Sequence, residues 1–154
     1  MSDDIKSSYD IICRHQGDKE MNLQDLGLHF TDVSLEGYKF ECQLISGEVE
    51  VLQVVIEGFE EIPIYISATD MQILCIAYLW SEDEVKAESK AEMLEVMMDM
   101  NIPMPLSSFS KVQGRYVVFG ALSVNSRFED VVHEVVTLGE NSVESISIMS
   151  EFLK

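Results

Sequence analysis

The stretch that decides the fold is YKFECQLISGEVEVLQVVIEGFEEIPIYISATDMQILCIAYLW, residues 38–80. Apolar and polar residues alternate along it, and this pattern predicts four strands, at 38–44, 49–56, 64–66 and 72–79. Ser46-Gly47 is a turn signal, and Pro63 permits only the start of a strand or a sheet edge. The last segment is apolar on both faces, so we expect it to be a central strand. Short strands with tight connections predict an antiparallel meander.

The same region is strongly acidic. Between Phe40 and Val85 the chain carries ten carboxylates and no Lys or Arg, and the net charge of the whole chain is −18. Such a surface repels phosphate backbones and anionic headgroups and attracts cations or basic partners. We therefore expect no nucleic-acid partner. We also expect no direct membrane insertion, because the longest apolar run, Ile73–Trp80, is too short to cross a bilayer. A surface that only keeps the protein soluble is the alternative interpretation.

Length and composition indicate one domain. The chain has 154 residues, of which 47% are apolar, enough to build a single core. We expect residues 1–20 to be a polar, partly flexible segment and residues 21–154 to be a single α+β domain. Cys13, Cys42 and Cys75 share no C-x-x-C spacing, and the N-terminus lacks the pattern of a signal peptide. These features predict reduced thiols and a cytoplasmic protein.

Start signals and apolar spacing predict the helices around this sheet. Short helices are expected at Ser7–Cys13 and after Asn22, a longer helix from a capping box at Ser81–Glu84 to Met100, and a last helix from a capping box at Ser126–Glu129 towards Leu153. Gly139 and Asn141 are positions where the last helix can kink. Two further strands are expected at 108–112 and 115–122. The order α-β-β-β(-β)-α-β-β-α predicts an α+β fold, an antiparallel sheet of five to six strands with helices packed on it.

No motif for a reaction is present. The chain lacks the phosphate-binding glycine loops, G-x-S-x-G and H-E-x-x-H, and its histidines have no metal-ligand spacing. Cys75 and His133 can meet if the central strand packs on the last helix. Glu60-Glu61 and Glu82–Glu84 can attract a cation but lack the spacing of a calcium loop. We therefore assign no catalytic residue, no cofactor and no metal, and expect a non-enzymatic protein. The alternative is an enzyme or small-ligand domain built from scattered carboxylates, Cys75 and tyrosines.

Methionines crowd the helix that ends near residue 100. We expect Ala87, Ala91, Leu94 and Met98 to form its inward stripe. The candidate partner-binding residues lie beside that stripe: Met93, Met97, Met100 and Met104. Methionine adapts its shape, so such a cluster suits a surface that accepts apolar partners, although it is also common core filler.

The last helix carries two apolar stripes between Phe128 and Leu153. One sheet and a neighbouring helix can cover both, or a second copy of the chain can cover one. Because most soluble oligomers are two-fold dimers, the excess apolar surface predicts a homodimer.

A family resemblance is carried by five blocks in order: Gly47–Val54, Gln72–Ile76, Leu79–Lys86, Asn101–Phe109 and Tyr116–Ser123. Over roughly two thirds of the chain, residues 1–20 excluded, the sequence resembles the YjfI-like family of uncharacterised bacterial proteins. The resemblance implies a bacterial cytosolic protein encoded near a relative of phage shock protein A, and it carries over no catalytic residue. The element order, small size and acidity are also similar to type III secretion chaperones. We therefore expect a chaperone-like adaptor that binds a protein partner, such as a basic or coiled-coil protein of a phage-shock-protein-A-like membrane stress system.

Overall fold

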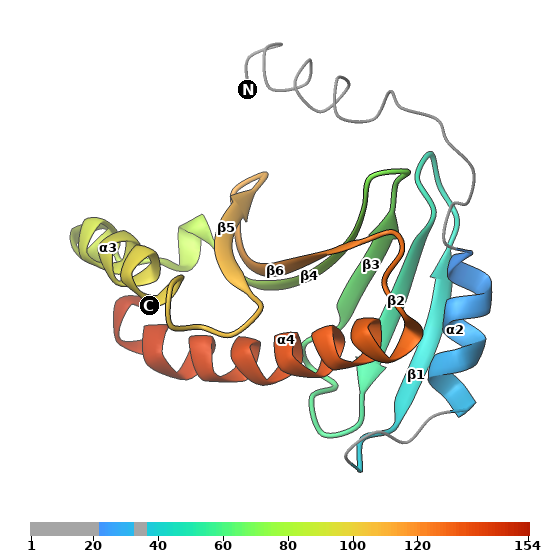
Figure 1. Ribbon diagram of the computed structural model, residues 1–154. Helices are drawn as coiled ribbons and strands as arrows, with labels where there is room; N and C mark the ends of the chain where they lie inside the picture. The colour runs from blue at the N-terminus through green and yellow to red at the C-terminus, as the bar shows by residue number, and fades with distance from the viewer. Residues whose placement is uncertain (1–21, 33–36) are drawn as a thin grey trace.

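The computed structural model describes residues 22–32 and 37–154 (Figure 1). The helix expected at Ser7–Cys13 and the polar segment 1–20 lie outside the described residues. The helices are α2 (Leu23–Asp32), α3 (Lys90–Met100) and α4 (Phe128–Met149), with three short 3-10 turns, η1 (Glu82–Glu84), η2 (Ala87–Ser89) and η3 (Ser150–Phe152). Asn22 begins α2 as expected, because its Oδ1 accepts the N–H groups of Gln24 and Asp25.

One antiparallel sheet of six strands forms the centre of the fold. The strands are β1 (Phe40–Ile45), β2 (Val51–Ile56), β3 (Ile64–Ala68), β4 (Gln72–Ser81), β5 (Ser108–Val112) and β6 (Arg115–Ser123). Their order in the sheet is β1-β2-β3-β4-β6-β5. The predicted meander is confirmed, and the segment predicted to be central, β4, lies between β3 and β6.

Two helices cover the inner face of the sheet. In Figure 1, α4 runs beneath the strands and α2 lies beside β1. Alternate strand residues point towards these helices and are fully or almost fully buried: Leu52, Val54, Ile56, Ile64, Ile66, Ile73, Cys75 and Ala77. Phe30 of α2 packs edge-to-face against Phe40 of β1 and Phe128 of α4, which closes the core at that end.

The outer face of the sheet is also apolar at its centre. Tyr65, Ile76 and Phe119 form one cross-strand row, with Leu74 and Tyr78 beside Ile76 on β4, and all five are half-buried. The rings of Tyr65 and Tyr78 lie 5.8 Å apart, edge to face. None of the described helices lies over this row (Figure 1).

The helix expected to start from a cap at Ser81 instead has its cap at Ser89 and begins at Lys90, so that prediction was wrong. Ser81 donates its N–H and its hydroxyl to Glu84 Oε2, each at 2.7 Å, but the turn that this closes ends at Glu84. Val85 is extended and pairs with Leu153. The N–H of Lys86 donates to the carbonyl of Phe152 at 2.9 Å. Pairing with the C-terminal residues therefore interrupts the helix until Lys90.

The last helix begins one residue later than expected and has no break. Its N-cap is Arg127, whose N–H and guanidinium donate to the Asp130 carboxylate, rather than Ser126 with Glu129. With 22 residues, α4 is about 33 Å long. Gly139 does not kink it. Instead, a Cβ there would lie 2.8 Å from Ile56 Cδ1, so glycine allows α4 to approach the sheet closely.

Both apolar stripes of α4 are largely covered within one chain. Val131, Val132, Val135, Val136, Leu138 and Met149 are at most 2% exposed, whereas Val143 and Ile148 are 41% and 39% exposed. This helix therefore leaves little apolar surface from which to expect a homodimer. None of the helices among the described residues has the length and apolar character needed to cross a bilayer.

Candidate protein-binding site

Helix α3 packs against the rest of the protein with the stripe next to the one expected. Met93 and Met97 are 0% and 4% exposed and join the core that contains Val85 and Phe152. The residues expected to point inward, Ala87, Ala91, Leu94 and Met98, are all exposed. That expectation was wrong because the sequence offers two adjacent stripes.

The four methionines named as candidate partner contacts separate into two pairs. Met93 and Met97 are buried in the folded chain, whereas Met100 and Met104 are half-buried and line a pocket. The structure therefore places only Met100 and Met104 where a partner can reach them, and a role for them in binding stays a prediction.

An exposed apolar stripe, which we call the α3 ridge, consists of Leu94, Met98 and Ile102. Their exposed fractions are 39%, 67% and 92%. The N–H of Met104 donates to the carbonyl of Met100 at 3.1 Å, so the helical path continues past the end of α3. Spaced four residues apart, the three side chains therefore follow one side of the helix. Sequence reasoning missed Ile102, although its spacing from Met98 was a usable signal.

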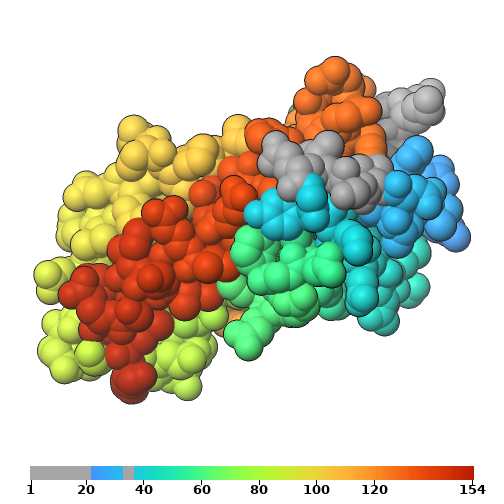
Figure 2. Space-filling view, turned by 90° about the horizontal axis from the view of Figure 1, so that it is seen from below, coloured from blue at the N-terminus to red at the C-terminus, as the bar shows by residue number. Residues whose placement is uncertain are grey.

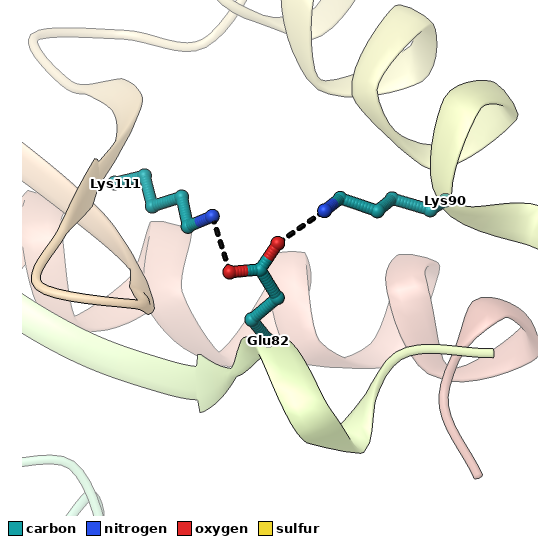
Figure 3. A network of polar contacts seen from close by, with 3 residues as sticks. All are labelled: Glu82, Lys90 and Lys111. Atoms are coloured by element: carbon teal, nitrogen blue, oxygen red, sulfur yellow. Dashed lines mark hydrogen bonds and ion pairs between the residues drawn. The ribbon is translucent and has the colours of Figure 1, made fainter. Parts of the chain in front are cut away.

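Two ion pairs made by Glu82 hold the beginning of α3 in place (Figure 3). One oxygen of Glu82 accepts from Lys90 at the start of α3, and the other accepts from Lys111 of β5 at 2.6 Å. The hydrogen bonds from Lys111 and Lys90 lower the pKa of Glu82 to about 2. Glu82 therefore connects α3 to the edge strand β5, and both of its oxygens are engaged in these ion pairs.

Positive charge gathers at this end of the molecule. The described part of the chain has seven Lys and Arg residues, and five lie around Glu82–Glu84: Lys86, Lys90, Lys111, Arg115 and Lys154. Lys154 Nζ, for example, donates to the carbonyl of Asp83 at 2.6 Å. The acidic run found in the sequence is thus compensated at this end by residues from outside the run.

Two hydrogen bonds connect the turn after α3 to α4. Asn141 Nδ2 donates to the carbonyl of Pro105 at 2.8 Å and to Ser107 Oγ at 2.9 Å. Between this turn and α4 lies a pocket of about 160 Å³, lined by Met100, Pro103, Met104, Pro105, Asn141, Glu144 and Ser145. Figure 2 shows the face of α4 (red) flanked by residues of α3 and the turn after it (yellow).

A buried carboxylate lies between α4 and the sheet. Glu134 is 4% exposed, and its Oε1 has no hydrogen-bond partner among the described residues. A Cβ at Gly120 of β6 would lie 1.5 Å from that oxygen, so the glycine makes the space for it. Burial raises the pKa of Glu134 above its ordinary value, and the charge of the neighbouring His133 opposes this rise only in part.

The cysteine and histidine considered as a nucleophile pair are separated. Cys75 is fully buried opposite Gly120, whereas His133 is exposed on α4. Burial, and secondarily the charge of Glu134, raise the pKa of the Cys75 thiol, and burial raises that of Cys42 to about 11. Both thiols are therefore protonated at neutral pH and poor nucleophiles.

Glu60, one of the carboxylates considered for a cation, already has a hydrogen-bond partner. Glu60 accepts the N–H of Gly58 at 2.8 Å, and this bond lowers the pKa of Glu60. In residues 22–32 and 37–154, no three His, Cys, Asp or Glu side chains are grouped so that they could hold a metal ion.

These observations define a small α+β protein with an anchored, outward-facing apolar helix. Residues 20–153 match the model of a family described as uncharacterised proteins conserved in bacteria, DUF2170. The chain belongs to this family, which confirms the expected membership of an uncharacterised bacterial family. No curated protein matches the sequence.

Among solved structures, the fold is similar to that of the type III secretion chaperone SycH of Yersinia pestis, determined in complex with a stable fragment of YscM2. The TM-score is 0.51 at 12% identity, covering 80% of this chain and 98% of SycH. The ExsC–ExsE complex is also similar, with a TM-score of 0.45 at 11% identity over 78% of this chain and 87% of the other. The predicted topology, similar to type III secretion chaperones, is confirmed.

Proposed function

We propose that this protein is a non-enzymatic, chaperone-like adaptor that binds a protein partner through the α3 ridge. The observation that carries the proposal is the exposure of Leu94, Met98 and Ile102 along one side of an anchored helix. Contiguous apolar side chains on a folded surface mark interaction sites, whereas single ones do not. Methionine adds a flexible, polarisable contact that adjusts to the partner.

The pocket supports an adaptor rather than an enzyme. A catalytic site requires titratable groups that converge on a substrate. This pocket has methionine and proline walls, and its single carboxylate, Glu144, belongs to an exposed residue. The likeness in fold to SycH, which was crystallised with a protein fragment, also supports protein binding.

Partner chemistry follows from charge. The outer surfaces of α3 and α4 carry Glu92, Glu95, Asp99, Glu129, Glu140 and Glu144, and after Lys90 neither helix has a Lys or Arg. A basic segment, such as one from a basic coiled-coil protein, would be attracted to this surface. We extend the proposal to a cytoplasmic partner of the phage-shock-protein-A type, which the family resemblance implies.

Homodimerisation remains part of the proposal, on a different surface. The row Tyr65, Ile76 and Phe119 on the outer face of the sheet is apolar, and none of the described helices covers it. Light scattering coupled to size exclusion tests this point. We expect the mass of two chains at micromolar concentration, and the mass of one chain would contradict it.

Partner binding is tested by affinity capture from the native host with mass spectrometry, using Met98→Glu. The added charge should abolish capture without unfolding the protein, because Met98 is exposed and burying the new carboxylate against a partner is costly. Met97→Glu is unsuitable, because Met97 is buried.

The matched control is Met71→Glu, since Met71 is 57% exposed in the turn before β4, away from α3. It should leave capture unchanged, as should the double variant Glu60→Gln and Glu61→Gln. If Met98→Glu is folded by circular dichroism and captures partners normally, while the glutamine variant loses them, the acidic surface is the binding site and the proposal is wrong.

A further inference from the structure

The pocket at the end of α3 has the size of one aromatic ring. Its volume is about 160 Å³. An engineered apolar cavity of roughly 150 Å³ is known to hold benzene. Ile102 of the α3 ridge directly precedes Pro103 of the pocket wall, so a segment lying on the ridge can reach the pocket.

The walls favour an aromatic side chain. Met100, Pro103, Met104 and Pro105 present two thioethers and two proline rings. Methionine sulfur makes favourable contacts with aromatic rings, and its flexible chain adjusts to their edges. No positively charged residue lines the pocket, so an anionic group inserted there would have no ion-pair partner.

A buried serine in the pocket wall adds a polar requirement. Ser145 is 1% exposed and lines the pocket, and its Oγ has no hydrogen-bond partner among the described residues. The amide nitrogen of Asn141 is already occupied by Pro105 and Ser107. An unpaired buried hydroxyl reduces stability until a partner supplies the bond. A ring with a hydroxyl at its tip, the side chain of tyrosine, meets both the apolar walls and Ser145.

Acidic residues at the pocket favour a positive charge next to the inserted ring. Glu144 lines the pocket and is exposed, and Glu140 lies one helical turn before it. The pocket is also at the carboxyl end of α3, where the partial negative charge of the helix favours a cation.

From these features we infer that the pocket holds a tyrosine side chain of a protein partner, in a segment with Lys or Arg beside that tyrosine. The inference rests on the proposed function, because it names what the partner inserts next to the α3 ridge. It assigns the recognition of the tyrosine hydroxyl to Ser145 and of the flanking cation to Glu144.

The test is a titration of the whole protein, followed by NMR of the isotope-labelled methyl groups of its methionines. The probes are three end-capped tripeptides: Lys-Tyr-Lys, Lys-Phe-Lys and Glu-Tyr-Glu. Lys-Tyr-Lys should shift the signals of Met100 and Met104, with a dissociation constant on the order of 1 mM for a single anchored ring. The signal of the distant Met71 should not move.

Specific variants separate the two contacts. Lys-Phe-Lys should bind about 2- to 10-fold more weakly, the usual effect of one lost hydrogen bond. Ser145→Ala should remove that difference, and Ser147→Ala, an exposed position on the same helix, should retain it. Glu-Tyr-Glu should bind about 2- to 5-fold more weakly, and Glu144→Gln should reduce that gap.

Two results would overturn the inference: no shift at Met100 and Met104, or equal binding of the tyrosine and phenylalanine peptides to the unmodified protein. The peptides replace the natural partner, so the two proposals can fail separately. If Met98→Glu abolishes partner capture but no tripeptide enters the pocket, only the inference is overturned. If Lys-Tyr-Lys binds as expected and Met98→Glu changes no capture, the α3 ridge is overturned as the binding surface and the tyrosine pocket is supported.

Discussion

Helices α3 and α4 carry similar apolar sequence patterns, but the structure buries these patterns to different extents. Each has two adjacent apolar stripes, and each could therefore hide one stripe against the protein and offer the other to a partner. In α4 both stripes are largely buried within one chain. In α3 only Met93 and Met97 are buried, and Leu94 and Met98 remain exposed.

Position relative to the sheet explains the difference. Helix α4 crosses beneath β3, β4 and β6 and also contacts α2, so it has neighbours on more than one side. Helix α3 lies beyond the edge strand β5 and makes few contacts with the other elements. An apolar stripe thus becomes core or binding surface according to what lies next to it, which the stripe itself does not encode.

The largest expected effect is on α4. Val135→Asp should lower the free energy of unfolding by at least about 4 kcal/mol, because it buries an unpaired charge at a fully buried position. Thermal unfolding followed by circular dichroism measures it. Val143→Asp, at a position that is 41% exposed on the same helix, is the control and should unfold like the unmodified protein. If Val135→Asp is equally harmless, the contrast between the helices is wrong.

A second prediction compares two methionines on α3. Met93→Ala should destabilise by about 2–5 kcal/mol, since it leaves a cavity in the core. Met98→Ala should stay within about 0.5 kcal/mol of the unmodified protein, because Met98 is exposed. Urea denaturation measures both. Equal effects would show that α3 does not present two different faces.

A third prediction concerns the carboxylate inside the α4 packing. The folded-state pKa of Glu134 is raised by burial, so its contribution to stability is present at low pH and is lost as pH rises from about 4.5 through the raised value. Glu134→Gln removes this loss and should raise the free energy of unfolding at pH 7 by about 1 kcal/mol. Denaturation at pH 5 and pH 8 measures it, and identical pH dependence in both proteins would contradict the burial of the charge.

The smallest effect is expected where α3 is anchored. Glu82 has a pKa lowered to about 2, so its contribution is present above about 4.5 and is lost as pH falls towards 2. Glu82→Gln should lower the melting temperature slightly at neutral pH and low salt, and the difference should vanish near 1 M salt, where charges are screened. A difference that persists in high salt would indicate that Glu82 acts through packing rather than charge.

Sequence reasoning located the sheet because strand periodicity is local. The alternation in β1 and β2, the doubly apolar β4 and the turn signals between them depend on neighbouring residues only, and the structure confirms them. The start of α3 could not be read in the same way. Ser81–Glu84 is a correct local turn, but the residues after it pair with Phe152 and Leu153, about seventy residues away along the chain.

The sequence predicted the methionine-rich helix, but not which of its faces is exposed. Met93 and Met97, predicted as partner contacts, belong to the core, and neither Ile102 nor Ser145 was among the predicted contacts. By itself, the sequence determined the class of fold and the acidity, because these follow from composition, local period and element order, and its sequence blocks resembled an uncharacterised bacterial family. Only the tertiary structure decided which face of α3 is free and that Met100 and Met104 line one pocket with Ser145, because both depend on residues distant in sequence.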